Sequence, residues 1–271
     1  MVPGARCACD SVRMIRLRTD FFSESLVMGT SMVVLMPQAT TGQIGMGGAV
    51  GDGPPPVLYL LHGLSDDCTI WERRTSIERY ASEAGIAVVM PEVRRSFYTD
   101  EAVGDAYWTY IAEELPRIVA RTFRVSEDPA DTFVAGLSMG GFGALKLALN
   151  HPDRFGAAAS LSGVVDLSAT DLFTRSREGH LGRRVWDGRD IAGTVDDIPG
   201  LLERAEPGAL PPLYLSCGTE DSLFSQNERV AALADERGHD LTVDFRPGDH
   251  TWEFWDAGIQ HVLAWLPLGG R

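Results

Sequence analysis

The chain contains little cysteine, and its cysteines form no recognisable framework. The four are Cys7, Cys9, Cys68 and Cys217. Cys7 and Cys9 are too close in sequence for an ordinary disulfide, and no further ligands complete a metal site around them. Cys217 ends an apolar run and is predicted to be a small buried hydrophobic residue. The absence of a disulfide framework favours a reducing compartment, so we expect a cytoplasmic protein.

Long apolar runs are also missing. No stretch reaches the length that a membrane-spanning helix requires, and we therefore expect no membrane partner. Residues 1–10 lack the apolar core of a signal peptide and are expected to form a disordered leader.

Positive charge is scarce as well. Lysine and arginine total 24 against 38 aspartates and glutamates, which gives a net charge of −14 and a pI near 4.8. This balance argues against a uniform phosphate-binding surface, so we expect no nucleic-acid partner and no docking to anionic membranes. We interpret the acidity as a contribution to solubility. No Gly-x-Gly-x-x-Gly opens a predicted helix, and no internal repeat is visible.

Strand and helix patterns alternate from residue 57 to the end. Apolar runs at 57–61, 86–90, 133–135, 155–161, 213–217 and 241–245 predict strands. Segments 75–84, 105–123, 139–149, 196–205, 226–238 and 252–266 predict helices, with Pro116 marking a kink or a new start. This alternation predicts a mostly parallel sheet with right-handed crossovers in one α/β domain over residues 11–271.

The remaining segments are less regular. Residues 12–18 and 26–36 predict two strands, the first a half-exposed edge strand. Residues 37–56 are rich in Gly, Thr and Pro and predict a flexible surface loop, and residues 94–104 predict another loop. The polar segment around 164–195 is the candidate for a cap over the site.

One serine stands where a strand pattern changes to a helical one. Gly136-Leu137-Ser138-Met139-Gly140 follows an apolar run and precedes helix-forming residues. Gly-x-Ser-x-Gly in this context is the nucleophile elbow, in which a strained serine projects above the sheet and bulkier residues at the glycine positions would collide with their neighbours. The following helix directs its positive end at a developing oxyanion. The alternative is a glycine-rich turn with an incidental serine.

A serine nucleophile needs a histidine base within hydrogen-bond reach. His250 is the histidine that stands beyond a late predicted strand, where such groups gather in α/β sheets. His62 precedes the serine and is expected to brace the oxyanion loop. The others stand in less suitable places: His151 at the far end of the elbow helix, His180 in the possible cap, His239 in a commonly solvated position after a helix, and His261 inside the last helix.

The histidine in turn needs an acid, in the order Ser, Asp, His. Asp221 follows the predicted strand 213–217 and is the favoured residue. Its neighbour Glu220 is the main rival, and Asp166 and Asp171 are weaker ones. Asp221 could alternatively be only the cap of the next helix.

Two backbone N–H groups should form the oxyanion hole. Met139 follows the nucleophile and supplies one, and Leu64, in the loop after residues 57–61, supplies the other. Asp66, Asp67 and Cys68 do not make a credible metal set without a histidine. We therefore expect no metal and no cofactor.

With these residues in place, the chain resembles the esterase D-like branch of the α/β-hydrolases, and most closely its small bacterial tributyrin-type acyl esterases. Relatives in that branch include S-formylglutathione hydrolases, feruloyl and acetyl-xylan esterases and mycolyltransferases. The stretches that carry the resemblance span residues 57 to 265: Leu60-Leu61-His62-Gly63-Leu64, Glu114-Leu115-Pro116, residues 136–143, Cys217-Gly218-Thr219-Glu220-Asp221, and residues 248–255.

The resemblance implies an α/β-hydrolase fold with antiparallel strands at the N-terminal edge of the sheet and helices on both faces. It places the nucleophile, acid and base on Ser138, Asp221 and His250, and the oxyanion donors on Leu64 and Met139. The implied function is a serine carboxylesterase acting on short-chain acyl esters. Alternatives are an acyltransferase, an S-formylglutathione hydrolase-type thioesterase and, more remotely, a non-catalytic binding scaffold. The expected partner is a small-molecule ester, and a homo-oligomer is left open.

Overall fold

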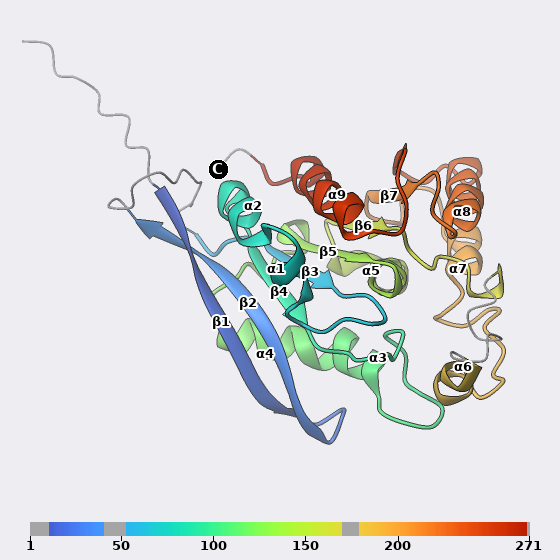
Figure 1. Cartoon of the computed structure of the whole chain (residues 1–271), viewed down its shortest axis with the longest axis horizontal. Helices are drawn as coiled ribbons and strands as arrows, with labels where there is room; N and C mark the ends of the chain where they lie inside the picture. Colours follow the sequence, from blue (N-terminus) through green and yellow to red (C-terminus); the bar gives the residue numbers. More distant parts are fainter. Residues whose placement is uncertain (1–10, 41–52, 170–178, 270–271) are drawn as a thin grey trace, which may run out of the picture.

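The computed structural model describes residues 11–40, 53–169 and 179–269, which contain an eight-stranded sheet. The strands lie in the order β1-β2-β4-β3-β5-β6-β7-β8 (Figure 1). They are β1 (Ser11–Ser23), β2 (Met28–Thr40), β3 (Val57–Leu61), β4 (Ala87–Pro91), β5 (Thr132–Leu137), β6 (Ala157–Leu161), β7 (Leu213–Gly218) and β8 (Leu241–Arg246). β1 pairs antiparallel with β2 and β2 with β4, whereas every other pair is parallel. The predicted mostly parallel sheet with antiparallel N-terminal edge strands is confirmed.

Helices connect the parallel strands. They are α1 (Ile70–Arg74), α2 (Ile77–Ala84), α3 (Tyr107–Thr109), α4 (Leu115–Thr122), α5 (Met139–Asn150), α6 (Gly179–Val185), α7 (Ile198–Arg204), α8 (Phe224–Glu236) and α9 (Trp252–Trp265). Short 3-10 turns lie at Pro129–Asp131, Pro152–Arg154 and Leu167–Ala169. None of the helices in the described ranges is both long and apolar enough to cross a membrane.

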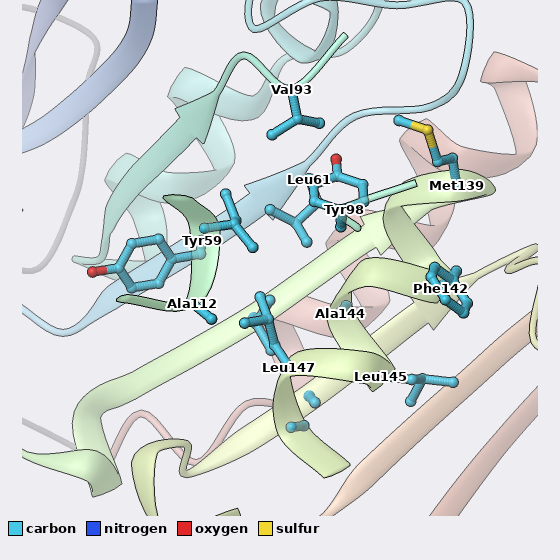
Figure 2. Close-up of a cluster of buried hydrophobic side chains, with 14 of the residues drawn as sticks. Tyr59, Leu61, Val93, Tyr98, Ala112, Met139, Phe142, Ala144, Leu145 and Leu147 are labelled. Atoms are coloured by element: carbon cyan, nitrogen blue, oxygen red, sulfur yellow. The ribbon is translucent and has the colours of Figure 1, made fainter. Parts of the chain in front are cut away.

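Two hydrophobic cores lie on opposite faces of the sheet, because successive strand residues point to opposite faces. Val57, Tyr59 and Leu61 of β3 join the core that α3, α4, α5, α7 and α8 cover. Leu58 and Leu60 of the same strand join the core beneath α1, α2 and α9. Figure 1 shows α2 and α9 on one side of the sheet and α4 on the other, and Figure 2 shows β3 and α5 side chains meeting in the first core. β3 is therefore buried on both faces, as its continuous apolar run predicts.

The predicted helix over 105–123 is helical but not uniform. α3 leads into a π-helical segment (Tyr110–Glu114), after which α4 begins at Leu115. Pro116 directly follows this π-helical turn, in a backbone that stays right-handed helical from Thr109 through Leu115. Of the two alternatives for Pro116, a new start is therefore wrong: the helical stretch is continuous and is interrupted by one wide turn just before the proline.

One local prediction is wrong, and one short helix was not predicted. The loop predicted over 37–56 begins too early, because β2 extends to Thr40 in antiparallel pairing with β1. The five-residue helix α1 was not predicted, since it is too short to show a helical period; its Trp71 is buried and donates from Nε1 to the Leu61 carbonyl at 3.2 Å. The proposed leader at 1–10 and parts of the loop and of the possible cap, residues 41–52 and 170–178, lie outside the described residues.

Candidate active site

Ser138 sits at the sharp turn between β5 and α5. Its backbone has φ of 53° and ψ of −116°, a conformation that a non-glycine residue adopts only under strain. The turn is held by hydrogen bonds from Ser138 N to the Leu161 carbonyl (2.9 Å) and from Phe142 N to the Ser138 carbonyl (3.1 Å). The strain is thus maintained by the sheet on one side and the helix on the other.

The two glycines of the motif are required by packing. A Cβ on Gly136 would collide with the backbone of Gly140, and a Cβ on Gly140 would collide with the Leu61 carbonyl of β3. Both contacts involve backbone atoms, which cannot move aside as the end of a flexible side chain can. The collisions predicted for side chains at 136 and 140 are therefore confirmed.

Neighbouring strands bring the serine, the histidine and the aspartate together. Asp221 lies three residues beyond the end of β7 and His250 four residues beyond the end of β8, and β7 and β8 pair in parallel with Gly218 opposite Arg246. His250 Nδ1 lies 2.7 Å from Asp221 Oδ2, and His250 Nε2 lies 3.1 Å from Ser138 Oγ. The imidazole therefore connects the two side chains, separated by 83 residues in sequence.

The charge on Asp221 is stabilised locally. Its side chain is fully buried, and burial alone would raise the pKa of the carboxyl group. Hydrogen bonds from His250 and from the Leu223 N–H (2.9 Å, to Oδ1) outweigh burial and lower the pKa. Asp221 is consequently ionised near neutral pH, and an ionised carboxylate can only accept. His250 Nδ1 then carries the proton, which leaves Nε2 free to accept from the Ser138 hydroxyl.

The rival acids lie elsewhere. Glu220 is exposed and its carboxylate accepts from the Gly248 N–H, while its own N–H donates to the Gly248 carbonyl at 3.0 Å. Glu220 thus fastens the loop that carries His250 without contacting the imidazole. Asp166 accepts from the backbone and hydroxyl of Ser168. Asp171 lies outside the described residues.

The loop that carries Leu64 is braced from several sides. His62 is buried; its Nδ1 lies 2.8 Å from the Gly63 carbonyl and its Nε2 accepts from Val93 N at 3.1 Å. The Tyr98 hydroxyl donates to the His62 carbonyl at 2.9 Å. The prediction that His62 braces this loop is confirmed.

The expected oxyanion donors lie on two different segments of this end of the sheet. Leu64 follows β3 and Met139 begins α5. Within residues 11–40, 53–169 and 179–269, neither the Leu64 N–H nor the Met139 N–H donates to another backbone carbonyl. Neither N–H is therefore committed to a backbone carbonyl in this part of the chain.

Three other histidines have partners away from the serine hydroxyl. His151 stacks on Trp108 with ring centroids 5.6 Å apart, and His261 contacts Asp244 on the outer edge of the sheet. The expectation that His239 is solvated is wrong: it is buried, and its Nε2 lies 2.8 Å from the Leu202 carbonyl of α7. Packing of α8 against α7 encloses this ring, which no local pattern indicates.

A buried ion pair behind the elbow was not predicted. Lys146 of α5 is fully buried, and its Nζ lies 2.5 Å from Asp196 Oδ1. The ammonium also donates to the Tyr98 carbonyl (2.8 Å) and the Thr99 hydroxyl (3.0 Å). This pair ties the elbow helix to the segment just before α7. In the sequence Lys146 is an ordinary helix-forming residue, so nothing distinguishes it from a solvated lysine.

Groups of three or more His, Cys, Asp or Glu side chains arranged to hold a metal ion do not occur among the described residues. The arrangement found instead is a hydroxyl, an imidazole and a buried carboxylate in hydrogen-bond contact. It can lower the cost of removing the hydroxyl proton, which is the requirement for nucleophilic attack by a serine.

Comparison with known families gives a match over most of the chain. The family model Esterase, described as "Putative esterase", matches residues 49–266. The chain belongs to this esterase family. A curated relative of this esterase, the acetyl esterase of Caldicellulosiruptor saccharolyticus, is 26% identical over 262 residues, which cover 93% of this chain and 98% of the relative.

Solved structures show the same architecture. FphF, a fluorophosphonate-binding serine hydrolase of Staphylococcus aureus, is 32% identical with a TM-score of 0.84, and the match covers 95% of this chain and 99% of that one. The S-formylglutathione hydrolase FrmB of Staphylococcus aureus is 31% identical with a TM-score of 0.77, over 95% of this chain and 100% of that one. This esterase is therefore a serine hydrolase of carboxylic esters with the α/β-hydrolase fold.

Proposed function

We propose that the protein hydrolyses short-chain acyl esters through an acyl-enzyme intermediate formed on Ser138. His250 acts as the base, Asp221 orients and stabilises the imidazolium, and the N–H groups of Leu64 and Met139 bind the oxyanion. The single observation that carries this proposal is the position of His250, whose two ring nitrogens contact Asp221 Oδ2 and Ser138 Oγ at 2.7 and 3.1 Å. Removal of the hydroxyl proton requires that geometry.

The reaction would follow two half-reactions. The Ser138 oxygen attacks the ester carbonyl while His250 Nε2 takes the hydroxyl proton, and the carbonyl oxygen gains negative charge between the two N–H donors. The imidazolium then gives its proton to the departing alcohol, which leaves the acyl group on Ser138. Water, activated by the same imidazole, attacks the acyl-enzyme and releases the carboxylic acid.

The first experiment pairs a serine variant with covalent labelling. Ser138→Ala should reduce ester hydrolysis by on the order of 10⁴ to 10⁶ while leaving the circular dichroism spectrum unchanged. A fluorophosphonate should label the parent protein at Ser138 and leave the variant unlabelled. Activity within tenfold of the parent would contradict the assignment, and failure of the folded parent to label would favour a binding scaffold.

We further propose a preference for small, uncharged acyl groups, from acetyl to butyryl. The sequence has no long apolar segment from which a lid for lipid interfaces could be built, and the similar acetyl esterase supports a short acyl chain. The net charge of −14 should slow the approach of anionic substrates. A comparison of kcat/KM for p-nitrophenyl acetate, butyrate and palmitate and for methyl ferulate tests this. A kcat/KM for p-nitrophenyl palmitate tenfold above that for the acetate and butyrate esters, about 1.4 kcal/mol of transition-state preference, would overturn the proposal.

The similarity to an S-formylglutathione hydrolase favours one second candidate, thioester hydrolysis by the same residues. Adding S-formylglutathione to the panel distinguishes thioester hydrolysis from ester hydrolysis. If short oxygen esters are preferred, kcat/KM should be lower for S-formylglutathione than for p-nitrophenyl acetate. Acyl transfer to a sugar or another alcohol is tested by analysing products with that acceptor present; hydrolysis predicts free acid as the main product.

Three accompanying proposals concern the whole protein. Buried, unpaired Cys68 and Cys217 suit a reducing location such as the cytoplasm. Residues 11–271 would form one domain in which the segment around 164–195 caps the site, and truncating that segment should alter acyl-chain preference. Sedimentation would decide whether the protein forms a homo-oligomer.

A further inference from the structure

A cavity lies at the end of the sheet opposite Ser138. It has a volume of about 180 Å³ and is bounded by the start of β3, the start of β5, the helix α4 and the 3-10 turn Pro129–Asp131. Val57 and Thr132, the first residues of β3 and β5, are paired neighbours and both line it. Because parallel strands run in one direction, this amino end of the sheet is separate from the carboxyl end that carries Ser138 and His250.

The walls of this cavity are mostly apolar. Val57, Ile111, Val119, Leu147 and Phe155 line it. A cavity of roughly 150 Å³ with such walls is large enough to hold a benzene molecule. The space therefore suits an apolar group of about the size of benzene.

Two hydrogen-bond donors that have no acceptor among the described residues indicate the kind of ligand. Tyr59 is only 8% exposed and lines the cavity, yet its hydroxyl has no hydrogen-bond partner among the described residues. Figure 2 shows this hydroxyl directed away from Met139 and the elbow. Burial raises the pKa of Tyr59, so the hydroxyl keeps its proton and can donate.

The second donor is the guanidinium of Arg154, which also lines the cavity. It lies over the Phe155 ring, 5.9 Å from the centroid, and the described part of the chain supplies it with no carboxylate partner. A partly buried cation without a carboxylate partner among the described residues favours an anionic ligand.

We propose that this cavity binds a small monocarboxylate with a short apolar tail, of the size of butyrate or benzoate. The carboxylate would accept from Arg154 and the Tyr59 hydroxyl together, and the tail would fill the apolar space. A carboxylate satisfies both donors, whereas a neutral amide offers one acceptor and no charge. Glu127 lines the exposed rim of the cavity. Its negative charge repels the carboxylate of the ligand, so the affinity of the site is low and binding is reversible.

Calorimetric titration of the Ser138→Ala variant with benzoate and butyrate, at constant ionic strength, tests the proposal. Ligands of this size should bind with a Kd on the order of 1 mM. Benzamide, which has the same shape and no charge, should bind at least about tenfold more weakly. Methyl chemical-shift changes from benzoate should centre on Val119 and Leu147, away from Ser138.

Matched variants distinguish this cavity from adventitious binding or from binding at the serine. Arg154→Gln should weaken benzoate by about tenfold or more, Tyr59→Phe should weaken it by a few fold, and Glu127→Gln should tighten it. Arg117→Gln removes the same charge from the exposed side of α4 and should change nothing. Equal affinity in the folded Arg154→Gln variant, equal affinity for benzamide, or no binding at ~20 mM benzoate would each overturn the proposal.

Discussion

The sharpest test of the site replaces Asp221 by asparagine, because the shape is kept and one charge is lost. Asp221 Oδ2 accepts from His250 Nδ1 at 2.7 Å, and its other oxygen accepts from Leu223 N at 2.9 Å. An asparagine that keeps the Leu223 contact through its oxygen presents its NH₂ group to His250. The imidazole must then accept at Nδ1 and carry its proton on Nε2, facing the Ser138 hydroxyl.

That tautomer cannot remove the serine proton. The expected loss in kcat for Asp221→Asn is about 10⁴-fold, which corresponds to roughly 5.5 kcal/mol of transition-state stabilisation. Hydrolysis of p-nitrophenyl butyrate gives kcat and KM, and circular dichroism checks that the variant is folded. KM should change much less than kcat, since the aspartate contacts the base and not the substrate.

Glu220→Gln is the matched control at the adjacent position. Its carboxylate is exposed and accepts from the Gly248 N–H, a role that a glutamine oxygen can keep. We expect less than about a tenfold loss for this variant. Asp166→Asn serves as a second control. A larger loss in Glu220→Gln than in Asp221→Asn would refute the assignment of Asp221 and make Glu220 the orienting acid.

Three other predictions concern the elbow, its support and the absence of a metal. Gly140→Ala should lower the free energy of unfolding by about 1–3 kcal/mol or prevent folding, because its Cβ meets the Leu61 carbonyl; urea titration measures this. Lys146→Met should cost about 3–5 kcal/mol because Asp196 is left buried without its cation, and adding Asp196→Asn should recover part of the loss. Overnight EDTA should leave esterase activity unchanged, and a loss that zinc restores would contradict a site made only of side chains and N–H groups.

Much of the sheet and the candidate site could be predicted because they depend on local signals. The apolar run at 57–61 and the strand, turn and helix around Ser138 leave clear patterns in sequence. His250 and Asp221 could be located because loops after parallel strands meet at one edge of the sheet. Their distances from Ser138 could not be predicted, since they depend on how β7 and β8 pair.

Features that depend on packing between distant segments left no such signal. Lys146 is buried because Asp196, fifty residues later, supplies its counter-charge. His239 is enclosed by α7, and α1 is too short to show a period. The π-helical segment before α4 is likewise invisible, because a single wide turn hardly changes the spacing of apolar residues.

The residues of strand β3 lie in chemically different surroundings along its length. At its carboxyl end, Leu61 contacts the elbow and leads into the loop braced by His62. Val57 at its amino end and Tyr59 at its centre line the cavity that we propose binds a carboxylate. Tyr59 is two residue steps of about 3.3 Å, roughly 7 Å, from Leu61 along the strand, and its hydroxyl is directed away from Met139 and the elbow (Figure 2). A carboxylate held by that hydroxyl and by Arg154 therefore lies on the side away from Ser138, so substitutions at the two sites can be interpreted independently.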